Sequence, residues 1–435
     1  MRRRLARIAI VILSIICVGA VRAQVPPFAM VDSVMQKDVI PQCARLDSNF
    51  LRFPAGLTPE FVRLIDKLDS VVLFGRGRVS ILHIGGSHVQ ADMYTEVFRK
   101  NIDSLNYGLR PARGYLFPYA VAKTNNPLGY KTTYRGKWDK ARNARRQFKP
   151  ALGMGGIAIY THDPTAWVSI DMEREQRGRW YANSLLLLGR SHGSLLPVLT
   201  AIDGRDTLVY PSRDSLGYRF NTAGLFSQFR IGIRPDSSFS TNFLKRDTLV
   251  ITGIVPENND DGIVYHTIGV NGASVPSYLG CRLFERELKA ITPDLVILAI
   301  GINDATDKDF NPEVFKSNYN TLLASMRRVS PNCAFIFITN NDSYRKAGRR
   351  RRVHNKNGAV AQAAFYDLAK TWGGAVWDLY EVMGGDQSID TWQKAGLAQR
   401  DRVHFSREGY QIVGTLFYQA FLNFYLEQDY VGDDK

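Results

Sequence analysis

The chain has 435 residues, of which 45% are hydrophobic and 22% are charged. This length and composition are typical of a folded protein with a large core and more than one domain. The formal net charge is +15, and the sequence has no low-complexity tract and no convincing internal repeat of the kind that solenoid proteins show.

The N-terminus has the pattern of a secretory signal. Residues 2–7 are rich in arginine, residues 8–20 are almost wholly apolar, and Val21-Arg22-Ala23 places small residues at the −3 and −1 positions. We expect cleavage after Ala23, because the apolar run is short for a membrane span; an uncleaved anchor is the alternative. No later run is long and apolar enough to span a bilayer. The sequence thus predicts export, to the periplasm or the cell exterior.

The charge of the exported part indicates the kind of partner. The five arginines of residues 1–23 leave about +10 on the rest, much of it in basic clusters at 137–149 and 345–352. An exported basic protein suits polyanionic surroundings such as a cell wall rather than nucleic acid. After cleavage three cysteines remain, Cys43, Cys281 and Cys333, so at most one disulfide is expected. No residue spacing predicts a metal site, and no cofactor is expected.

Residues 24–125 begin an α/β pattern. Apolar residues at helical spacing predict a helix over 58–73, and a β-rich run over 79–84 leads into Gly85-Gly86-Ser87. A helix is expected over 92–105. Strand, glycine turn, serine and helix is the arrangement that presents a nucleophile at the carboxyl end of a parallel strand.

The pattern changes to all-β over residues 126–261. Short β-rich runs separated by Gly, Asp and Ser occur at β-sandwich spacing, among them 157–160, 167–170, 185–188 and 248–251. No long helical pattern interrupts them. We therefore predict an inserted all-β, sandwich-like domain at 126–261, with Trp138, Trp167, Trp180 and Tyr181 as candidate sugar-stacking residues, although core packing is the ordinary fate of each.

The α/β pattern resumes over residues 262–435. Strands are expected at 263–268, 295–300, 334–339 and 375–378, and helices at 278–290, 315–329, 359–372 and 407–425. Alternating strands and helices predict a parallel sheet covered by helices on both faces. The two α/β segments, 24–125 and 262–435, would then form one domain interrupted by the insertion.

Four short motifs could build an ester-hydrolysing site. Ser87 needs a base to accept its proton, and His404, three residues after Asp401, can be that base with Asp401 as its orienting acid. The backbone N–H groups of Gly272 and Ser87 and the side-chain amide of Asn303 are candidate oxyanion donors. Each motif alone has an ordinary structural explanation, such as a tight turn or a helix cap; their shared order favours serine-type ester hydrolysis.

These motifs resemble the SGNH (GDSL-type) hydrolase superfamily over residues 79–105 and 262–425. The resemblance implies a three-layer α/β/α fold, Ser87 as nucleophile, Gly272 and Asn303 as oxyanion donors, and His404 with Asp401 as base and acid. One departure is that Gly86 stands where the family usually has Asp, which concerns the rigidity of the turn rather than the chemistry.

A narrower resemblance concerns residues 87–92 and 113–119. They are similar to the peptidoglycan O-acetylesterase branch of the superfamily, which also has a β-sandwich insertion between its first two motifs. His88, Gln90 and Asp92 are expected to support the nucleophile turn. The resemblance implies an exported esterase that removes O-acetyl groups from a polysaccharide, with peptidoglycan favoured over xylan, capsule or lipid esters. An O-acetyltransferase and a non-catalytic cell-wall-binding protein are the alternatives.

Overall fold

The computed structural model describes residues 43–427 except 107, 146–149, 174–177, 236–246 and 350. The predicted signal segment, residues 1–23, lies outside the described residues, as do parts of both basic clusters. Within the described part of the chain, no helix combines the length and the apolar character needed to cross a membrane.

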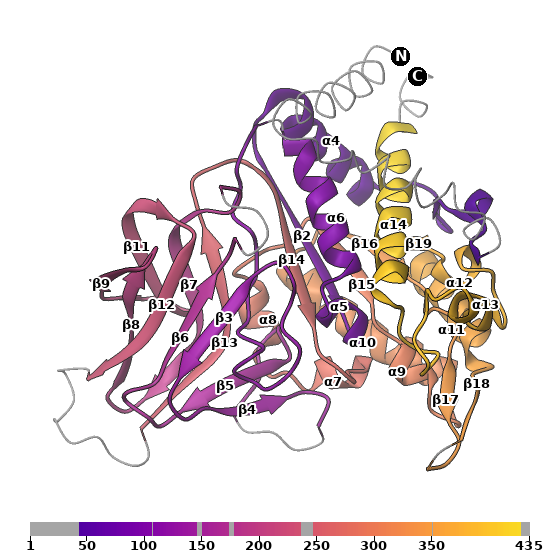
Figure 1. Ribbon diagram of the computed structural model, residues 1–435. Coiled ribbons are helices and arrows are strands. Elements are labelled where there is room, and N and C mark those ends of the chain that lie inside the picture. The colour runs from indigo at the N-terminus through magenta and orange to yellow at the C-terminus, as the bar shows by residue number, and fades with distance from the viewer. Residues whose placement is uncertain are drawn as a thin grey trace.

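A six-stranded sheet forms the centre of the α/β part, in the order β1-β19-β16-β15-β2-β14 (Figure 1). Five strands are parallel, and only the short edge strand β1 is antiparallel. The strands are β1 (Leu51–Arg52), β2 (Arg78–Gly85), β14 (Gly262–Gly269), β15 (Leu295–Ala299), β16 (Ala334–Ile338) and β19 (Ala375–Trp377). All parallel strands end at one edge, where Gly85 pairs with both Gly269 and Ala299.

Helices cover both faces of this sheet (Figure 1). One face packs against α4 (Pro59–Phe74), α6 (Tyr94–Asp103) and α14 (Arg407–Glu427), and the other against α10 (Pro312–Val329) and α11 (Asn357–Trp372). Neighbouring residues of β2 point to opposite faces, so Ile81 joins the first cluster and Leu82 the second. This arrangement confirms the predicted three-layer α/β architecture.

Residues 131–257, here called the β region, form two antiparallel sheets (Figure 1). Their orders are β10-β11-β7-β13-β5-β4 and β3-β6-β12-β8-β9. The strands are β3 (Lys131–Arg135), β4 (Asp139–Arg142), β5 (Ile157–Thr161), β6 (Trp167–Asp171), β7 (Ala182–His192), β8 (Leu195–Ile202), β9 (Arg205–Val209), β10 (Ser212–Arg213), β11 (Gly217–Phe226), β12 (Gln228–Pro235) and β13 (Thr248–Glu257). No helix occurs among the described residues of 126–261.

The β region shares its core with the α/β part. A single cluster of buried residues runs from Leu187 in β7 to Leu298 in β15. Polar contacts cross the same boundary, since the Tyr115 hydroxyl donates to the Thr252 carbonyl at 2.6 Å and the Thr252 hydroxyl donates to Glu287 at 2.6 Å. Replacing residues 126–261 by a linker would expose this shared core. The independence of residues 126–261 as a domain therefore stays a prediction.

The structure differs from the sequence predictions in several elements. The helix expected over 278–290 is two short helices, α7 (Val275–Leu279) and α8 (Phe284–Leu288), which Gly280–Leu283 separate because the Leu283 N–H turns away to the Leu152 carbonyl. The helix expected at 92–105 begins at Tyr94, after α5 (Ser87–Gln90) and a left-handed Asp92 with φ 50°. The sequence also did not predict β1, α9 (Ile302–Ala305), α12 (Leu379–Val382), α13 (Ser388–Lys394) or the hairpin of β17 (Tyr344–Lys346) and β18 (Arg352–His354).

The three cysteines of the described chain are all buried and unpaired. Cys43, Cys281 and Cys333 form no disulfide with one another in the structure. Burial raises the pKa of the Cys281 and Cys333 thiols to about 12, so both stay protonated and act as small apolar groups.

Candidate active site

The turn that carries Ser87 is held tightly at the carboxyl end of β2. Ser87 is the first residue of α5, and the Gln90 N–H closes the turn by donating to the Gly86 carbonyl at 3.0 Å. The Tyr278 hydroxyl donates to the Gly85 carbonyl at 2.8 Å. These bonds fix the turn although Gly86 replaces the Asp that similar sequences carry.

The two glycines of this turn differ in how much room surrounds them. A Cβ on Gly85 would lie 2.5 Å from the Val89 side chain and 2.6 Å from the Ala299 carbonyl oxygen, whereas a Cβ on Gly86 would have no neighbour closer than 3.4 Å. We therefore expect Gly85→Ala to lower the free energy of unfolding by about 1–3 kcal/mol, as overpacking does. Gly86→Ala, which meets no such close neighbour, should lower it by less than Gly85→Ala does. Urea denaturation of the two variants checks this, and equal losses would contradict it.

Ser87, His404 and Asp401 form a continuous line of hydrogen bonds. Ser87 Oγ lies 2.8 Å from His404 Nε2, and His404 Nδ1 lies 2.7 Å from Asp401 Oδ2. With Asp401 ionised, Nδ1 carries the proton and donates to the carboxylate, which leaves Nε2 free to accept the Ser87 proton. The structure thus brings Ser87 into contact with the Asp401–His404 pair, which lies more than 300 residues later in the sequence.

The carboxylate of Asp401 is held in its ionised form. Burial would raise its pKa, but hydrogen bonds from the His404 ring and from the backbone N–H groups of His404 and Val403 outweigh burial and hold that pKa well below its usual range. An ionised Asp401 favours the tautomer of His404 described above and stabilises the imidazolium that forms when His404 accepts a proton.

A loop and a hairpin that the sequence did not predict hold the Asp401–His404 segment from behind. The Asp401 carbonyl accepts from Arg352 at 3.0 Å, the Arg402 carbonyl from the Tyr344 N–H at 2.8 Å, and the Val403 carbonyl from Asn341 at 3.0 Å. Arg402 is left-handed, with φ 53°, and its guanidinium lies over the Tyr344 ring. Three consecutive carbonyl groups are therefore fixed by residues 341–352.

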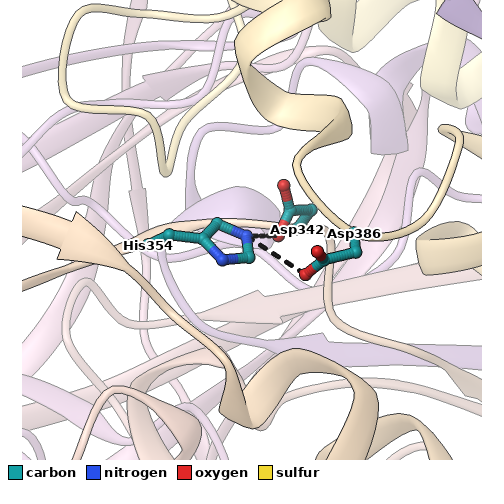
Figure 2. A group of neighbouring side chains, drawn as sticks. All are labelled: Asp342, His354 and Asp386. Atoms are coloured by element: carbon teal, nitrogen blue, oxygen red, sulfur yellow. Dashed lines mark hydrogen bonds and ion pairs between the residues drawn. The ribbon is translucent and has the colours of Figure 1, made fainter.

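A cluster of His354 with two carboxylates anchors the base of this hairpin (Figure 2). His354 Nε2 lies 2.7 Å from buried Asp342 and 3.6 Å from Asp386. It is the one group of described residues with the types and spacing of a divalent-cation site, its ligand atoms lying within 4.8 Å of one another. Asp386 is 63% exposed and the imidazole already contacts both carboxylates, so hydrogen bonding of His354 to Asp342 accounts for the arrangement.

The candidate oxyanion donors lie at the same edge of the sheet as Ser87. Asn303, in α9, donates one amide hydrogen to the Ala273 carbonyl at 2.8 Å, and its nitrogen would lie 3.4 Å from a Cβ on Gly86. Gly272 has φ 82°, a conformation that favours glycine. The turn containing Gly272 is fixed to α5 because the Asn271 N–H donates to the Gln90 side chain at 2.7 Å.

The structure places His88, Gln90 and Asp92 in supporting contacts, as the sequence predicted. His88 Nδ1 contacts the Tyr410 hydroxyl at 2.8 Å, and its ring lies 5.2 Å from that of His404. Burial lowers the pKa of His88 to about 3, so it stays neutral beside His404. The Gln90 amide donates to Thr124 and Asn125, which fixes α5 to the loop of residues 119–125.

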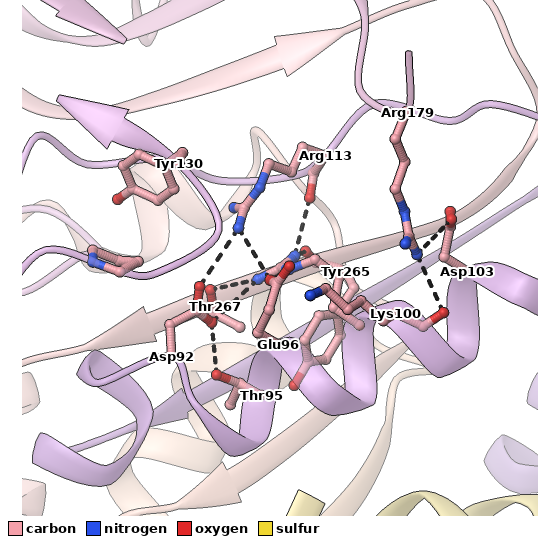
Figure 3. A network of polar contacts seen from close by, with 12 residues as sticks. Asp92, Thr95, Glu96, Lys100, Asp103, Arg113, Tyr130, Arg179, Tyr265 and Thr267 are labelled. Carbon is pink, nitrogen blue, oxygen red and sulfur yellow. Dashed lines mark hydrogen bonds and ion pairs between the residues drawn. The ribbon is translucent and has the colours of Figure 1, made fainter. Parts of the chain in front are cut away.

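Asp92 belongs to a buried network of charges (Figure 3). Arg99 and Arg113 both contact Asp92 at 3.5 Å and Glu96 at about 3 Å, and Arg99 also donates to the Arg113 carbonyl. Burial would raise the pKa of Glu96, but the two arginines lower it below its usual value. The network joins residues 87–92 to residues 113–119, the two segments of the narrower resemblance. A buried, paired network of this kind holds both segments in place.

The four candidate sugar-stacking residues differ in exposure. Trp180 is 6% exposed and belongs to the core. Trp138, Trp167 and Tyr181 are half-buried, with the Trp138 indole donating to the Arg135 carbonyl and the Arg230 guanidinium lying over Trp167. Core packing therefore removes Trp180 from the candidates.

Known proteins resemble this chain in sequence family and in fold. Residues 247–412, which include Gly272, Asn303, Asp401 and His404 but not Ser87, match the GDSL-like lipase/acylhydrolase family. A solved peptidoglycan O-acetylesterase is 18% identical, with a TM-score of 0.65 over 87% of this chain and 99% of that one. At that identity the likeness shows a shared fold. No curated protein sequence matches the chain.

Two smaller solved proteins align with part of the chain only. An acetyl xylan esterase, AlAXEase, is 17% identical over 36% of this chain and 81% of its own, and a putative acylhydrolase from Bacteroides fragilis is 17% identical over 38% and 76%. Both TM-scores are 0.28, too low to support an argument.

The family match and the α/β fold together indicate an ester-hydrolysing enzyme.

Proposed function

We propose that this chain, which resembles the SGNH hydrolases in family match and fold, is an exported serine esterase that removes O-acetyl groups from peptidoglycan. The observation that carries the proposal is the hydrogen-bonded line from Ser87 through His404 to Asp401 at the carboxyl edge of the sheet. The acetylated polymer is proposed from the fold shared with a peptidoglycan O-acetylesterase and from the basic charge of the chain.

The geometry supports a two-step acyl transfer. His404 Nε2 takes the Ser87 proton as Oγ attacks the acetyl carbonyl, and Asp401 stabilises the resulting imidazolium. His404 then gives the proton to the departing sugar oxygen, which leaves an acetyl ester on Ser87. Water, deprotonated by His404, attacks this ester, and acetate leaves as Ser87 recovers its proton. The two steps together return Ser87 and His404 to their starting state, and neither step needs a cofactor.

Donors at the sheet edge would stabilise the oxyanion of each tetrahedral intermediate. The proposed donors are the backbone N–H groups of Ser87 and Gly272 and the second amide hydrogen of Asn303, whose first is bonded to Ala273. Such donors act where charge develops in the transition state, so they raise kcat more than they tighten substrate binding.

Asn303→Ala should lower kcat roughly 10²- to 10³-fold and change KM little, because one oxyanion donor is lost. Steady-state kinetics on p-nitrophenyl acetate measures both constants. Asn311→Ala is the matched control: Asn311 caps α10 by accepting from the Glu313 and Val314 N–H groups, so its loss should lower stability but not kcat. An effect of Asn303→Ala on KM alone would instead mark Asn303 as a binding residue.

Export is part of the proposal and rests on residues 1–23. Their basic start, apolar run and small residues before Gln24 have the pattern of a cleaved signal. The proposed location is the periplasm or the cell exterior, where O-acetylated wall polymers occur and nucleic acid is not a partner.

Labelling with a fluorophosphonate tests whether the chain is catalytic. The reagent should attach to Ser87, and Ser87→Ala should prevent the attachment, because only an activated serine reacts. Labelling of neither protein would favour a non-catalytic wall-binding protein. Free acetate released from the polymer separates hydrolysis from acetyl transfer, in which the acetyl group would appear on an acceptor sugar instead.

A further inference from the structure

Four basic residues lie on two segments that pass the Gly272 turn, next to the proposed site. They are Lys123, Lys140, Arg142 and Arg145, here called the basic rim. Ala144, between two of them, would lie 3.7 Å from a Cβ on Gly272. Three of the four residues follow one another in β4 and just after it. This segment is fixed because the Asn143 N–H donates to the Gly156 carbonyl at 2.8 Å.

The fourth residue of the basic rim, Lys123, lies in the loop of residues 119–125. Its loop is fixed to the end of β14 by the Tyr119 hydroxyl, which donates to the Gly269 carbonyl at 3.0 Å, and by Asn125, which accepts from Asn271 at 2.6 Å. Lys123 itself has φ 53°, a left-handed conformation that is uncommon and costly for lysine. A strained backbone therefore places this positive charge beside the Gly272 turn.

The rim charges are close together and without a negative partner. Partial burial, followed by the charges of Arg142, Lys123 and Arg145, lowers the pKa of Lys140, so the four cations lie within electrostatic reach of one another. None of them forms an ion pair within the part of the chain that the structure describes. Unpaired like charges repel one another unless an anion lies between them.

We propose that the basic rim binds carboxylate groups of the acetylated glycan and so selects substrates that carry a carboxylate close to the acetyl ester. The inference rests on the proposed function, because the rim matters for selection only if Ser87 acts on an ester. Lysine and arginine bind carboxylates through charge-assisted hydrogen bonds, which neutral glycans cannot replace. Since the rim is partly exposed, its contribution weakens with salt.

The experiment compares one polymer in two charge states. O-acetylated peptidoglycan free of attached phosphate polymers is used as such and after its carboxylates have been amidated. At low ionic strength we expect the wild type to show about ten-fold higher kcat/KM on the carboxylate form, since exposed ion pairs each contribute about 1.5- to 5-fold. In the triple variant Lys123→Asn, Lys140→Gln, Arg142→Gln this preference should fall to about two-fold or less. Salt at about 0.5 M should reduce the wild-type preference similarly.

A second triple variant controls for net charge. Arg205→Gln, Lys289→Gln and Lys370→Gln remove the same charge from exposed positions. Lys289 follows α8 and Lys370 lies in the last turn of α11, and both helices lead back to the amino edge of the sheet. Arg205 is the first residue of β9. This variant should keep the wild-type preference. A wild type without preference, or equal losses in the two triple variants, would overturn the proposal.

Binding separates this inference from the proposed function. Wild-type hydrolysis of p-nitrophenyl acetate tests the esterase alone. If that hydrolysis were absent, pelleting of the protein with carboxylate-bearing or amidated peptidoglycan would still test the rim. Stronger pelleting with the carboxylate form, lost in the rim variant and kept in the control, would support the rim; equal pelleting with both forms would overturn it.

Discussion

Ser87→Ala is expected to lower kcat on acetate esters by roughly 10⁴- to 10⁶-fold. The variant removes the oxygen that lies 2.8 Å from His404 Nε2 and leaves no side-chain nucleophile at the end of β2. The residual rate would come from the oxyanion donors and from substrate binding. Initial rates on p-nitrophenyl acetate at equal concentrations of purified wild-type and variant protein measure the loss.

Two controls accompany this variant. Its urea midpoint should stay close to that of the wild type, because the serine hydroxyl makes no other bond that the structure describes. Ser215→Ala, at an exposed serine of the β region, should keep full activity. Near-normal turnover by Ser87→Ala would show that another residue is the nucleophile.

His404→Ala should cost about as much as Ser87→Ala, and the double variant should cost no more than either alone. Serine without its base is a weak nucleophile, so the two residues act as one unit. Kinetics of both single variants and of the double variant on p-nitrophenyl acetate measure this coupling. Losses that multiply in the double variant would contradict it.

Asp401→Asn completes this second prediction. The carboxamide can still accept the backbone N–H groups of Val403 and His404, but it can hold His404 in the wrong tautomer. A loss of roughly 10³- to 10⁴-fold in kcat with a normal urea midpoint is expected. A loss in both activity and stability would indicate that Asp401 mainly supports the fold of the loop.

The sequence predicted those elements whose local pattern decides their structure. The apolar run over 295–300 became the buried strand β15, and the helical spacing over 58–73 became α4. The motifs predicted Ser87, Asn303 and His404 as site residues; strand order brings Ser87 and Asn303 to one edge, and His404 reaches Ser87 from the loop before α14. Parallel strands place their carboxyl ends together whatever the distance along the chain.

The β17–β18 hairpin could not be predicted because its neighbours decide its structure. Residues 345–352 are mostly basic and show no apolar alternation, so the sequence indicated a solvated cluster. The hairpin forms against the loop that carries Asp401 and His404, where Arg352 donates to the Asp401 carbonyl. Such long-range contacts leave no local signal, and the same holds for the hydrogen bond between His354 and Asp342.

The sequence also did not indicate that the β region and the α/β part share one core. The run of four leucines at 185–188 predicts a strand but not what covers its two faces. In the structure these leucines pack in one cluster with residues of the α/β sheet. The boundaries at 126 and 261 therefore follow a change of pattern rather than a gap in packing.

Release of acetate from O-acetylated peptidoglycan tests the central claim most directly. The protein lacking residues 1–23 is incubated with O-acetylated peptidoglycan, with acetylated xylan and with peptidoglycan that has been de-O-acetylated by base, and free acetate is measured over time. The account predicts release from O-acetylated peptidoglycan at a higher kcat/KM than from xylan, none from the de-O-acetylated polymer, and none by Ser87→Ala. Equal release by Ser87→Ala, or no release from either acetylated polymer, would contradict it.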